Sequence, residues 1–372
     1  METTHHVFLE PLDVLFLRGN KSFGDPGSFG ASFIPPWPSV AAGALRSRLY
    51  ADGALDVAAL QDPAQFTLTA FNLARRNDQG EVERLHALPA DLVVQGEAAE
   101  RKLRAMHPRA LAADISCSAT LPQVPLLAED ATRQKASIGW WLTDGGWARY
   151  LAGQLPALAQ LVKSDELWKT DIRIGVGIAH DTRRADDGKL FTTQAMALHK
   201  RCDVNATAIV GFAATARCAA LPNSGLVRLG GDGRAATIHP CRAPDSAKLK
   251  PGTGGRFKLV LTTPGIFPSG WRPPGVDDAD VWHGPQGCTA RLVCAAVPRC
   301  QTVSGWDLAH WHPKDAQRAA PTGSVYWFED FSGNPAALEM LVETGLWGLA
   351  GQTNDAQRQA EGFNRCAVGT WS

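Results

Sequence analysis

The residues of this chain that could do chemistry are few and widely spaced. His310-Trp311-His312 would put two imidazoles on one side of a strand, as a metal pair requires, but no carboxylate or thiol lies beside them. The eight cysteines form no CxxC pair, so we predict small buried thiols instead of a zinc site. Gly230-Gly231-Asp232-Gly233 is followed by Arg234 and lacks the further carboxylates of a two-metal centre, which favours a hairpin turn.

Standard enzyme signatures are missing as well. The chain contains no GxxxxGK[ST] loop, no GxSxG elbow and no HExxH helix. Gly175-Val176-Gly177 begins like a dinucleotide fingerprint, but residue 180 is histidine where that motif needs glycine. Ten histidines leave open a metal-independent ribonuclease with a histidine base, without indicating which one. We therefore predict no catalytic residues, no metal and no cofactor.

The composition is typical of a globular protein. The 372 residues are 45% apolar and 20% charged, which excludes general disorder. Lys and Arg total 37 and equal Asp and Glu at 37, so any site for a polyanion must be a local patch. No apolar run of membrane-spanning length occurs, and the first residues lack a secretory pattern. We expect a cytoplasmic protein with no membrane partner.

Two local clusters of basic residues stand out. Residues 18–48 include four Lys or Arg residues and one Asp, and residues 169–201 include seven Lys or Arg residues and four Asp. The first cluster includes Arg18, Lys21, Arg46 and Arg48. The second surrounds an expected turn and includes Arg183, Arg184 and Lys189. His180, Thr182 and Phe191 lie close to these cations in the sequence. A projecting hairpin with cations and an aromatic ring suits the backbone and bases of single-stranded RNA.

The pattern of the second cluster predicts a hairpin, with strands over Ile172–Asp181 and Lys189–Leu198. Asp187-Gly188 favours a two-residue turn. That turn would place Arg184 opposite Phe191 and Thr182 opposite Thr193. The aromatic ring would then have no apolar partner in its own domain.

The remaining elements predict an α+β fold. Val7–Arg18 reads as a strand interrupted at Pro11, and 39–50 as a helix with Ser39 as its N-cap and Arg46 and Arg48 flanking the apolar stripe. Residues 97–168 read as a helix-rich insertion. Further strands are expected over Phe66–Leu73, Arg84–Val94, Phe257–Thr263, Ala290–Val297, Ser324–Glu329 and Asn364–Trp371, with a helix over Ala336–Trp347. This order favours a helix layer on an antiparallel sheet, present twice.

A glycine-rich segment follows the last expected helix. Gly345, Gly348 and Gly351 precede a second glycine pair at Gly362 and Gly369. Glycine lets a backbone approach a phosphate closely and leaves amide donors available, although a plain loop between helix and strand has the same composition.

Together these segments resemble a known family, the RAMP proteins of CRISPR effector complexes, and within it the third subunit of the type III-B Cmr complex. Four ordered segments carry the resemblance: 11–18 with 35–46, the hairpin 176–192, Leu229–Arg234, and 321–328 before the C-terminal glycines. The chain departs from the family pattern where Gln352–Glu361 stretches the glycine segment.

The resemblance implies two ferredoxin-like (RRM-like) domains with a projecting β-hairpin and no catalytic centre. We place them at 1–205, with the insertion at about 97–168 and the hairpin at about 172–198, and at 206–372. It further implies a subunit that holds the 5′ tag of a guide crRNA, meets target RNA at the hairpin, and contacts the large polymerase-like subunit and the first backbone RAMP subunit. The residues assigned to RNA are Arg18, Lys21, Ser39, Arg46, Arg48, His180, Thr182, Arg183, Arg184, Lys189, Phe191, Gly348, Gly351 and Arg365.

Two alternatives stay open. A Cas6-like guide-processing endoribonuclease would share the architecture but needs a histidine or tyrosine at the scissile phosphate. A scaffold without RNA contact would leave the paired arginines at 46/48 and 183/184 without a role.

Overall fold

The structure is a computed structural model, and it divides the chain into two compact units. It describes residues 3–17, 29–30, 36–56, 59, 62–97, 100–112, 114–127, 134–198, 200–203, 206–231, 233–244, 255–307 and 312–371. Arg18, Lys21, Asp232, His310 and Trp311 therefore lie outside the described residues. Unit 1 comprises Met1–Val82, Asp165–Arg242 and Thr302–Gln317, and unit 2 comprises Glu83–Ser164, Ala243–Gln301 and Arg318–Ser372. Each unit thus gathers three segments, whereas the sequence suggested one boundary after residue 205.

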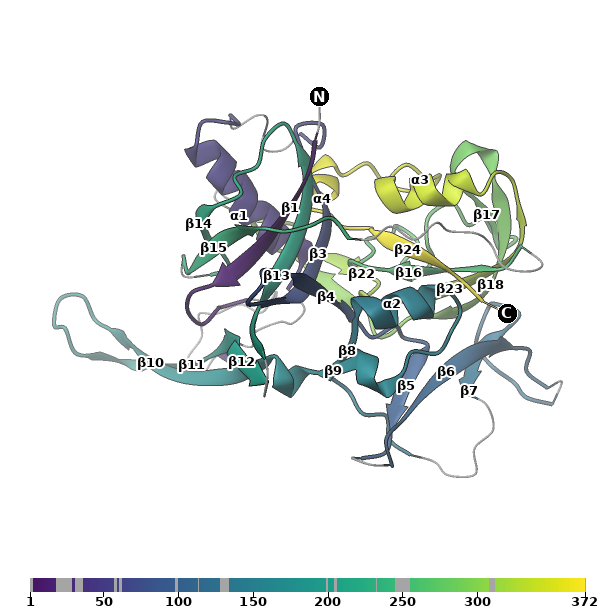
Figure 1. The fold of residues 1–372 in the computed structure, drawn as a ribbon, viewed down its shortest axis with the longest axis horizontal. Coiled ribbons are helices and arrows are strands. Elements are labelled where there is room, and N and C mark those ends of the chain that lie inside the picture. The colour runs from purple at the N-terminus through teal and green to yellow at the C-terminus, as the bar shows by residue number, and fades with distance from the viewer. Residues whose placement is uncertain are drawn as a thin grey trace. The chain divides into compact units, whose positions relative to one another are not determined.

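Unit 1 is built on an antiparallel sheet with the strand order β14-β15-β1-β13-β3, and β12 pairs beside it with β13 (Figure 1). The strands are β1 (Thr3–Pro11), β3 (Phe66–Asn77), β12 (Lys200–Asp203), β13 (Ala206–Cys218), β14 (Gly225–Arg228) and β15 (Ala235–Pro240). Strand β1 ends at Pro11, where the sequence predicted an interruption, since proline cannot donate to the ladder.

Strand β13 lies between β1 and β3 in this sheet, and the sequence analysis missed it. Its residues are mostly small, and at position 211 only glycine fits. A Cβ there would lie 2.4 Å from the Leu9 carbonyl oxygen and 2.7 Å from the Phe8 ring. Phe8, Leu9 and Phe212 are fully buried where β1 pairs with β13. The small residues therefore permit close packing against the large ones of β1.

Helix α1 (Pro38–Ala51) packs its apolar stripe, which includes Leu45 and Leu49, into unit 1. The helix begins one residue earlier than predicted. Pro38 occupies the first turn and Trp37 is the N-cap, with no side-chain cap hydrogen bond. The prediction of Ser39 as N-cap is therefore wrong, because the fixed φ of proline already suits the first helical position.

Unit 2 contains a sheet of order β17-β18-β23-β16-β24 and two smaller strand groups, β4-β8-β9 and β5-β6-β7. The first sheet comprises β16 (Phe257–Leu261), β17 (Val281–His283), β18 (Thr289–Ala296), β23 (Val325–Ser332) and β24 (Cys366–Thr370). The smaller groups comprise β4 (Val82–Ala87), β5 (Leu92–Gln95), β6 (Lys102–Arg109), β7 (Val124–Leu127), β8 (Trp140–Thr143) and β9 (Leu161–Lys163). The α-helices of unit 2 are α2 (Asp144–Leu151), α3 (Ala336–Thr344) and α4 (Ala356–Ala360).

The remaining elements are short. Among the described residues, 3₁₀ turns cover Leu158–Gln160, Ser164–Glu166 and Pro285–Gly287. Two small ladders join β19 (Gln301–Val303) to β22 (Gln317–Ala319) and β20 (Trp306–Asp307) to β21 (His312–Pro313).

The described residues of segment 97–168 hold more strand than helix, where the sequence analysis predicted a helix-rich insertion. Its described residues hold β6 to β9, and α2 is the one α-helix among them. All four residues of β8 are buried, including Trp140 and Trp141, and in β6 Leu103 and Pro108 are buried among more exposed residues. Short apolar runs of this kind occur in strands and in helices, so the sequence does not distinguish the two. The prediction of a helical insertion is therefore wrong.

Four strands in each unit follow the same order. Numbered along the chain, the first strand lies between the fourth and the third, and the second lies beyond the third: β15-β1-β13-β3 in unit 1 and β24-β16-β23-β18 in unit 2. Unit 1 carries its helix, α1, between the first and second strands, and unit 2 carries α3 between the third and fourth. The core of unit 2 includes Phe257 stacked on Phe328, with ring centroids 4.8 Å apart.

Candidate nucleic-acid interface

A long hairpin formed by β10 (Trp168–Ile178) and β11 (Ala185–Leu198) extends from unit 1 (Figure 1). Its base is fixed in the unit: Ala195 and Met196 are buried, and Met196 exchanges backbone hydrogen bonds of 2.8 and 2.9 Å with Leu15. The short strand β2 (Phe29–Gly30) pairs in parallel with β11 at Thr192 and Thr193. The strands β10 and β11 pair over the range 172–198 in which the sequence predicted a projecting hairpin.

The turn of this hairpin differs from the predicted one. The chain reverses over Ala179–Arg184, where the Ala179 N–H donates to the Arg184 carbonyl and the Arg183 N–H donates to the Ala179 carbonyl, both at 2.9 Å. Arg183 has φ 52°, a left-handed conformation that costs a non-glycine residue energy. Asp187-Gly188 instead falls within β11, where the register shifts between the Val176–Leu190 and Ile178–Ala185 pairs. The Asp-Gly pair that the sequence analysis interpreted as a turn therefore lies in a β-bulge.

The register also changes the predicted cross-strand neighbours. Phe191 pairs with Gly175 and Thr193 pairs with Arg173, so Arg184 does not oppose Phe191 and Thr182 does not oppose Thr193. The Phe191 ring lies against Gly175, where an added Cβ would be 2.4 Å from its Cζ. The prediction of an aromatic ring with no apolar contact in its own domain is therefore wrong.

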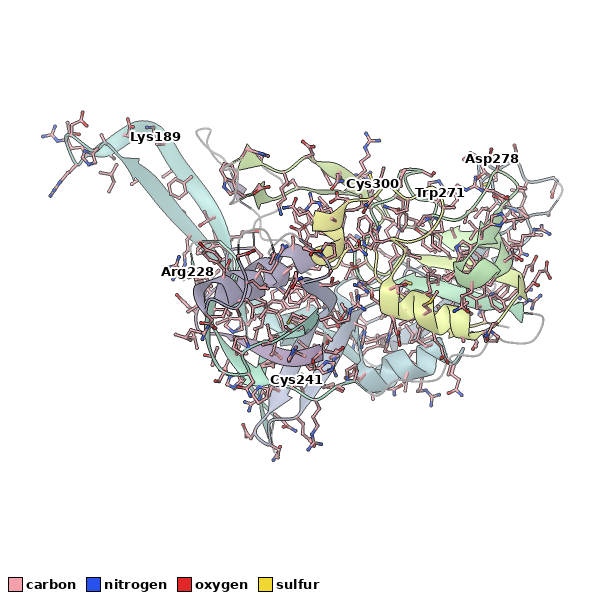
Figure 2. The ribbon with its side chains drawn as sticks, turned by 90° about the horizontal axis from the view of Figure 1, so that it is seen from above. Lys189, Arg228, Cys241, Trp271, Asp278 and Cys300 are labelled. Atoms are coloured by element: carbon pink, nitrogen blue, oxygen red, sulfur yellow. The ribbon has the colours of Figure 1, made fainter. Side chains whose placement is uncertain are left out.

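The turn of the hairpin carries exposed cations. His180, Thr182, Arg183 and Arg184 are all exposed. Among the described residues neither the Arg183 nor the Arg184 side chain has an ion-pair or hydrogen-bond partner, whereas Lys189 pairs with Asp186. Figure 2 shows Lys189 toward the outer end of the hairpin. Two unpaired guanidinium groups on an exposed turn are suited to phosphate oxygens.

The body of the hairpin has an aliphatic face that the sequence analysis missed. Alternate residues of a strand share one face, and cross-strand partners share it too. Five large aliphatic residues follow this rule and are between 44% and 73% exposed: Ile172, Ile174, Val176, Ile178 and Leu190. The alternation was weak in the sequence because both faces of this ribbon are open to solvent.

Arg46 and Arg48 on α1 are bound to the protein. Arg46 is 9% exposed, donates to the Ala42 carbonyl at 3.3 Å and lies 5.8 Å from the centroid of Phe66. Arg48 donates to Asp52 at 2.7 Å and to the Leu226 carbonyl at 2.9 Å. The prediction that Arg46 reaches RNA conflicts with its burial, because a long side chain can fold its cation onto an apolar neighbour.

The C-terminal glycine segment is partly accessible. Gly348 and Gly351 are exposed, and a Cβ at either would meet no atom within 4 Å, so neither is required by internal packing. Arg365, by contrast, is 2% exposed and donates to the Glu343 carbonyl at 2.7 Å. Its burial conflicts with the predicted RNA contact, and its role here is to join α3 to the start of β24.

The stretch Gln352–Glu361, which departs from the family pattern, is anchored by a buried ion pair. Arg358 and Glu361 are 3% and 1% exposed, and their side chains meet at 3.1 Å. Asp355 caps α4 by accepting from the Arg358 N–H at 2.9 Å. The added residues therefore form a packed helical turn, which the polar sequence did not indicate.

The described cysteines differ in burial. Cys218, Cys288, Cys294 and Cys366 are buried, whereas Cys241 is half-buried and Cys117 and Cys300 are exposed, so the prediction of buried thiols fails for the last three. Burial raises the pKa of Cys294 and of Cys366 to about 12. Within the described ranges no cluster of three or more His, Cys, Asp or Glu side chains could hold a metal ion, and no helix is long and apolar enough to span a membrane.

The fold and this surface define a protein of two sheet-rich α+β units with exposed cations on a hairpin turn. Residues 7–371 match the family model described as CRISPR-associated protein (Cas_Cmr3), so the chain belongs to that family. The family predicted from the sequence, a type III-B Cmr subunit, is confirmed.

Solved structures similar to this chain come from type III-B complexes. One is a chain of the Cmr-beta complex bound to cognate target RNA and AMPPnP in state 1, at 15% identity and TM-score 0.44, covering 90% of this chain and 88% of that chain. Another is from Cmr-beta bound to cognate target RNA, at 15% identity and TM-score 0.45, covering 87% and 86%. No curated protein matches the chain.

Proposed function

We propose that the chain is a non-catalytic RNA-binding subunit of a cytoplasmic type III-B Cmr effector complex in antiviral defence. In this role it holds the 5′ tag of the guide RNA and docks the large polymerase-like subunit onto the backbone. The observation that carries the proposal is the exposed turn with Arg183 and Arg184, whose guanidinium groups have no partner among the described residues. Membership of the Cas_Cmr3 family supports the choice of complex.

Two ferredoxin-like units are part of the proposal. A βαββαβ unit has two helices on an antiparallel sheet. Each unit here has the same order of four strands and one of those two helices, α1 in unit 1 and α3 in unit 2. Loss of one helix from each copy is consistent with a duplicated ancestor.

The proposed contacts to guide and target RNA lie at two accessible places. The first is the turn, with His180, Thr182, Arg183, Arg184 and Lys189, and the second is the backbone at Gly348 and Gly351. Arg18 and Lys21 remain predicted contacts. Ser39 and Arg48 are half-buried and could offer only part of their polar atoms, whereas Phe191 must leave Gly175 before it stacks on a base.

The aliphatic face of the hairpin favours a second role, docking onto a neighbouring protein subunit. The five residues Ile172, Ile174, Val176, Ile178 and Leu190 present no charge that would pair with phosphate. Apolar surface of this kind on a two-stranded ribbon is costly in water unless a partner covers it. We assign the turn to RNA and this face to a protein partner.

A hairpin truncation tests the assignment of the turn to RNA. Val176 and Leu190 form the last regular pair before the bulge, so replacing residues 177–189 by Asn-Gly should close a two-residue turn there. The truncated subunit should join the complex but protect the guide or target RNA less from nuclease. The control is the full hairpin with Asp181→Asn, which keeps every cation.

Two results would contradict the proposal. Normal RNA protection in a complex that contains the truncated subunit would remove the turn from the RNA interface. Cleavage of guide precursor by the pure protein, abolished by a single His substitution, would favour the processing-ribonuclease alternative.

A further inference from the structure

A pocket of about 390 Å³ opens within unit 2 and has no role in the proposed function. Its lining comes from the residues around β5 and β6, the end of α2, and the facing strands β16, β23 and β24. Volumes of this size accommodate small organic ligands. The pocket therefore has room for a ligand, and its chemistry decides which class.

Three buried polar side chains form its floor. Tyr150 donates its hydroxyl to Asp91 at 2.7 Å, and the Lys258 ammonium lies 3.4 Å from the other Asp91 oxygen. The same ammonium is 3.4 Å from the centroid of the Tyr150 ring. The side chains of Asp91 and Lys258 are only 3% and 7% exposed. A buried ion pair of this kind is not favoured for stability alone, because desolvation offsets the attraction.

Lys258 is incompletely satisfied in this arrangement. An ammonium has three donors, and Asp91 is the one acceptor that Lys258 meets among the described residues, at a distance longer than a strong charge-assisted bond. Burial lowers the pKa of Lys258, and the Asp91 carboxylate opposes that effect. A ligand that brought an anionic oxygen into the pocket would complete the donors of the ammonium.

The rest of the lining fits an anion with an apolar, planar body. Arg104 adds a second cation, so two cations and one carboxylate line the pocket, and His107 of β6 is also part of the lining. Apolar surface comes from Leu92, Met106, Leu155 and Trp371. Indole rings pack well against planar heterocycles, and arginine and lysine bind phosphate.

We propose that this pocket binds a nucleotide, with the phosphate toward Lys258 and Arg104 and the base against the apolar wall. The chemistry is the same for a free mononucleotide and for the terminal nucleotide of an RNA strand. The inference does not depend on the proposed function, because the hairpin turn belongs to unit 1 and the whole lining of the pocket belongs to unit 2.

Calorimetric titration of the full chain tests the pocket with AMP, UMP, adenosine and inorganic phosphate as probes. We expect both mononucleotides to bind at least about tenfold more tightly than adenosine, since a charge-assisted hydrogen bond is lost without the phosphate. A 5′-phosphorylated hexanucleotide and its 5′-hydroxyl form distinguish the sources. Competition by the phosphorylated oligomer assigns the site to an RNA end, and binding by mononucleotides alone assigns it to a free nucleotide.

Two variants keep the test independent of folding. Lys258→Met with Asp91→Asn removes the charges together and leaves an acceptor for Tyr150, so no buried charge is stranded. Leu155→Trp fills the mouth and leaves the floor intact, and Leu155 is 47% exposed. Both should weaken nucleotide binding at least about tenfold, while Lys102→Met, an exposed lysine on the same strand β6, should not.

The proposal is overturned if the native chain binds none of these probes at about 1 mM, the weak limit for a specific site. It is also overturned if Leu155→Trp binds as the native chain does. Binding that persists in the hairpin truncation but not in Leu155→Trp would support the pocket even if the proposed RNA role of the hairpin were wrong.

Discussion

Phe191 lies against the backbone of Gly175, its partner across the hairpin, so closely that a Cβ on residue 175 would be 2.4 Å from the ring. The ring thus has a seat within the hairpin that only glycine provides. This contact lies between the buried base and the exposed turn of the ribbon. Even the methyl group of an alanine at position 175 would overlap the ring.

Gly175→Ala should loosen the hairpin. The added methyl displaces Phe191, and overpacking of this kind costs about 1–3 kcal/mol. Amide hydrogen exchange in β10 and β11 should accelerate at least about fivefold, with the two units otherwise unchanged. Thr192→Ala, which alters a side chain next to the ring without overlap, is the control. Equal protection in Gly175→Ala and the native chain would contradict the packing described here.

Arg183→Ala with Arg184→Ala should weaken RNA binding in a salt-dependent way. Each lost phosphate contact on a single strand lowers the log–log slope of affinity against salt by about 0.7. Titration of the assembled complex with labelled RNA at several salt concentrations measures that slope. Arg109→Ala with Arg299→Ala removes two exposed charges from unit 2 and should leave the slope unchanged. If the two double variants behave alike, the turn is not a phosphate contact.

Arg46→Ala should act on stability and not on RNA. Loss of the contact with Phe66 should lower the free energy of unfolding by about 1 kcal/mol. Urea denaturation of the isolated subunit gives this quantity, and Arg46→Lys, which retains a cation, should recover part of it. A flatter salt dependence of RNA binding in Arg46→Ala, with stability unchanged, would restore the role predicted from the sequence.

Gly348→Ala and Gly351→Ala should differ. Gly351 has φ 77°, so alanine there is strained and should destabilise the subunit by about 1 kcal/mol. Gly348 has open space and no left-handed backbone, so alanine should leave stability unchanged. Reduced guide binding by the folded Gly348→Ala subunit would therefore report a close backbone contact, and normal binding would remove Gly348 from the interface.

Thiol labelling should separate the cysteines by burial. At pH 8 Cys117 and Cys300 should react with a disulfide reagent quickly, and Cys294 and Cys366 only after unfolding. Because their pKa in the fold is raised from 9.0 to about 12, the stability they contribute is complete below pH 9 and is lost as the pH rises toward 12. Rapid labelling of Cys218, Cys288, Cys294 or Cys366 in the folded chain would contradict this arrangement.

Local sequence patterns predicted the helices and strands better than they predicted which arginine side chains are exposed. The ranges of α1, β3, β16, β18 and β23 follow from apolar periodicity and proline or glycine boundaries. The turn was wrong because Asp187-Gly188 suits a tight turn and a bulge equally well. Arg46 and Arg365 were assigned to RNA because composition cannot tell an exposed guanidinium from one folded onto a ring or a carbonyl.

The pocket floor had no local signal at all. Asp91 and Lys258 are 167 residues apart in the sequence, and Tyr150 of α2 lies between them in the sequence. Each residue alone is unremarkable in the sequence. Their meeting depends on the pairing of β16 and on the placement of α2, which are tertiary features.

The alternation of segments between the two units has a consequence for biosynthesis. A ribosome passes from one unit to the other five times along the chain, and unit 1 lacks its last segment until Gln317 has been made. Neither unit can therefore fold to completion while the other is still untranslated, and no contiguous expression fragment contains a whole unit alone. Genetic dissection of this subunit must proceed by substitution or by shortening loops such as the hairpin, because a stop codon anywhere before residue 317 leaves both units unfinished.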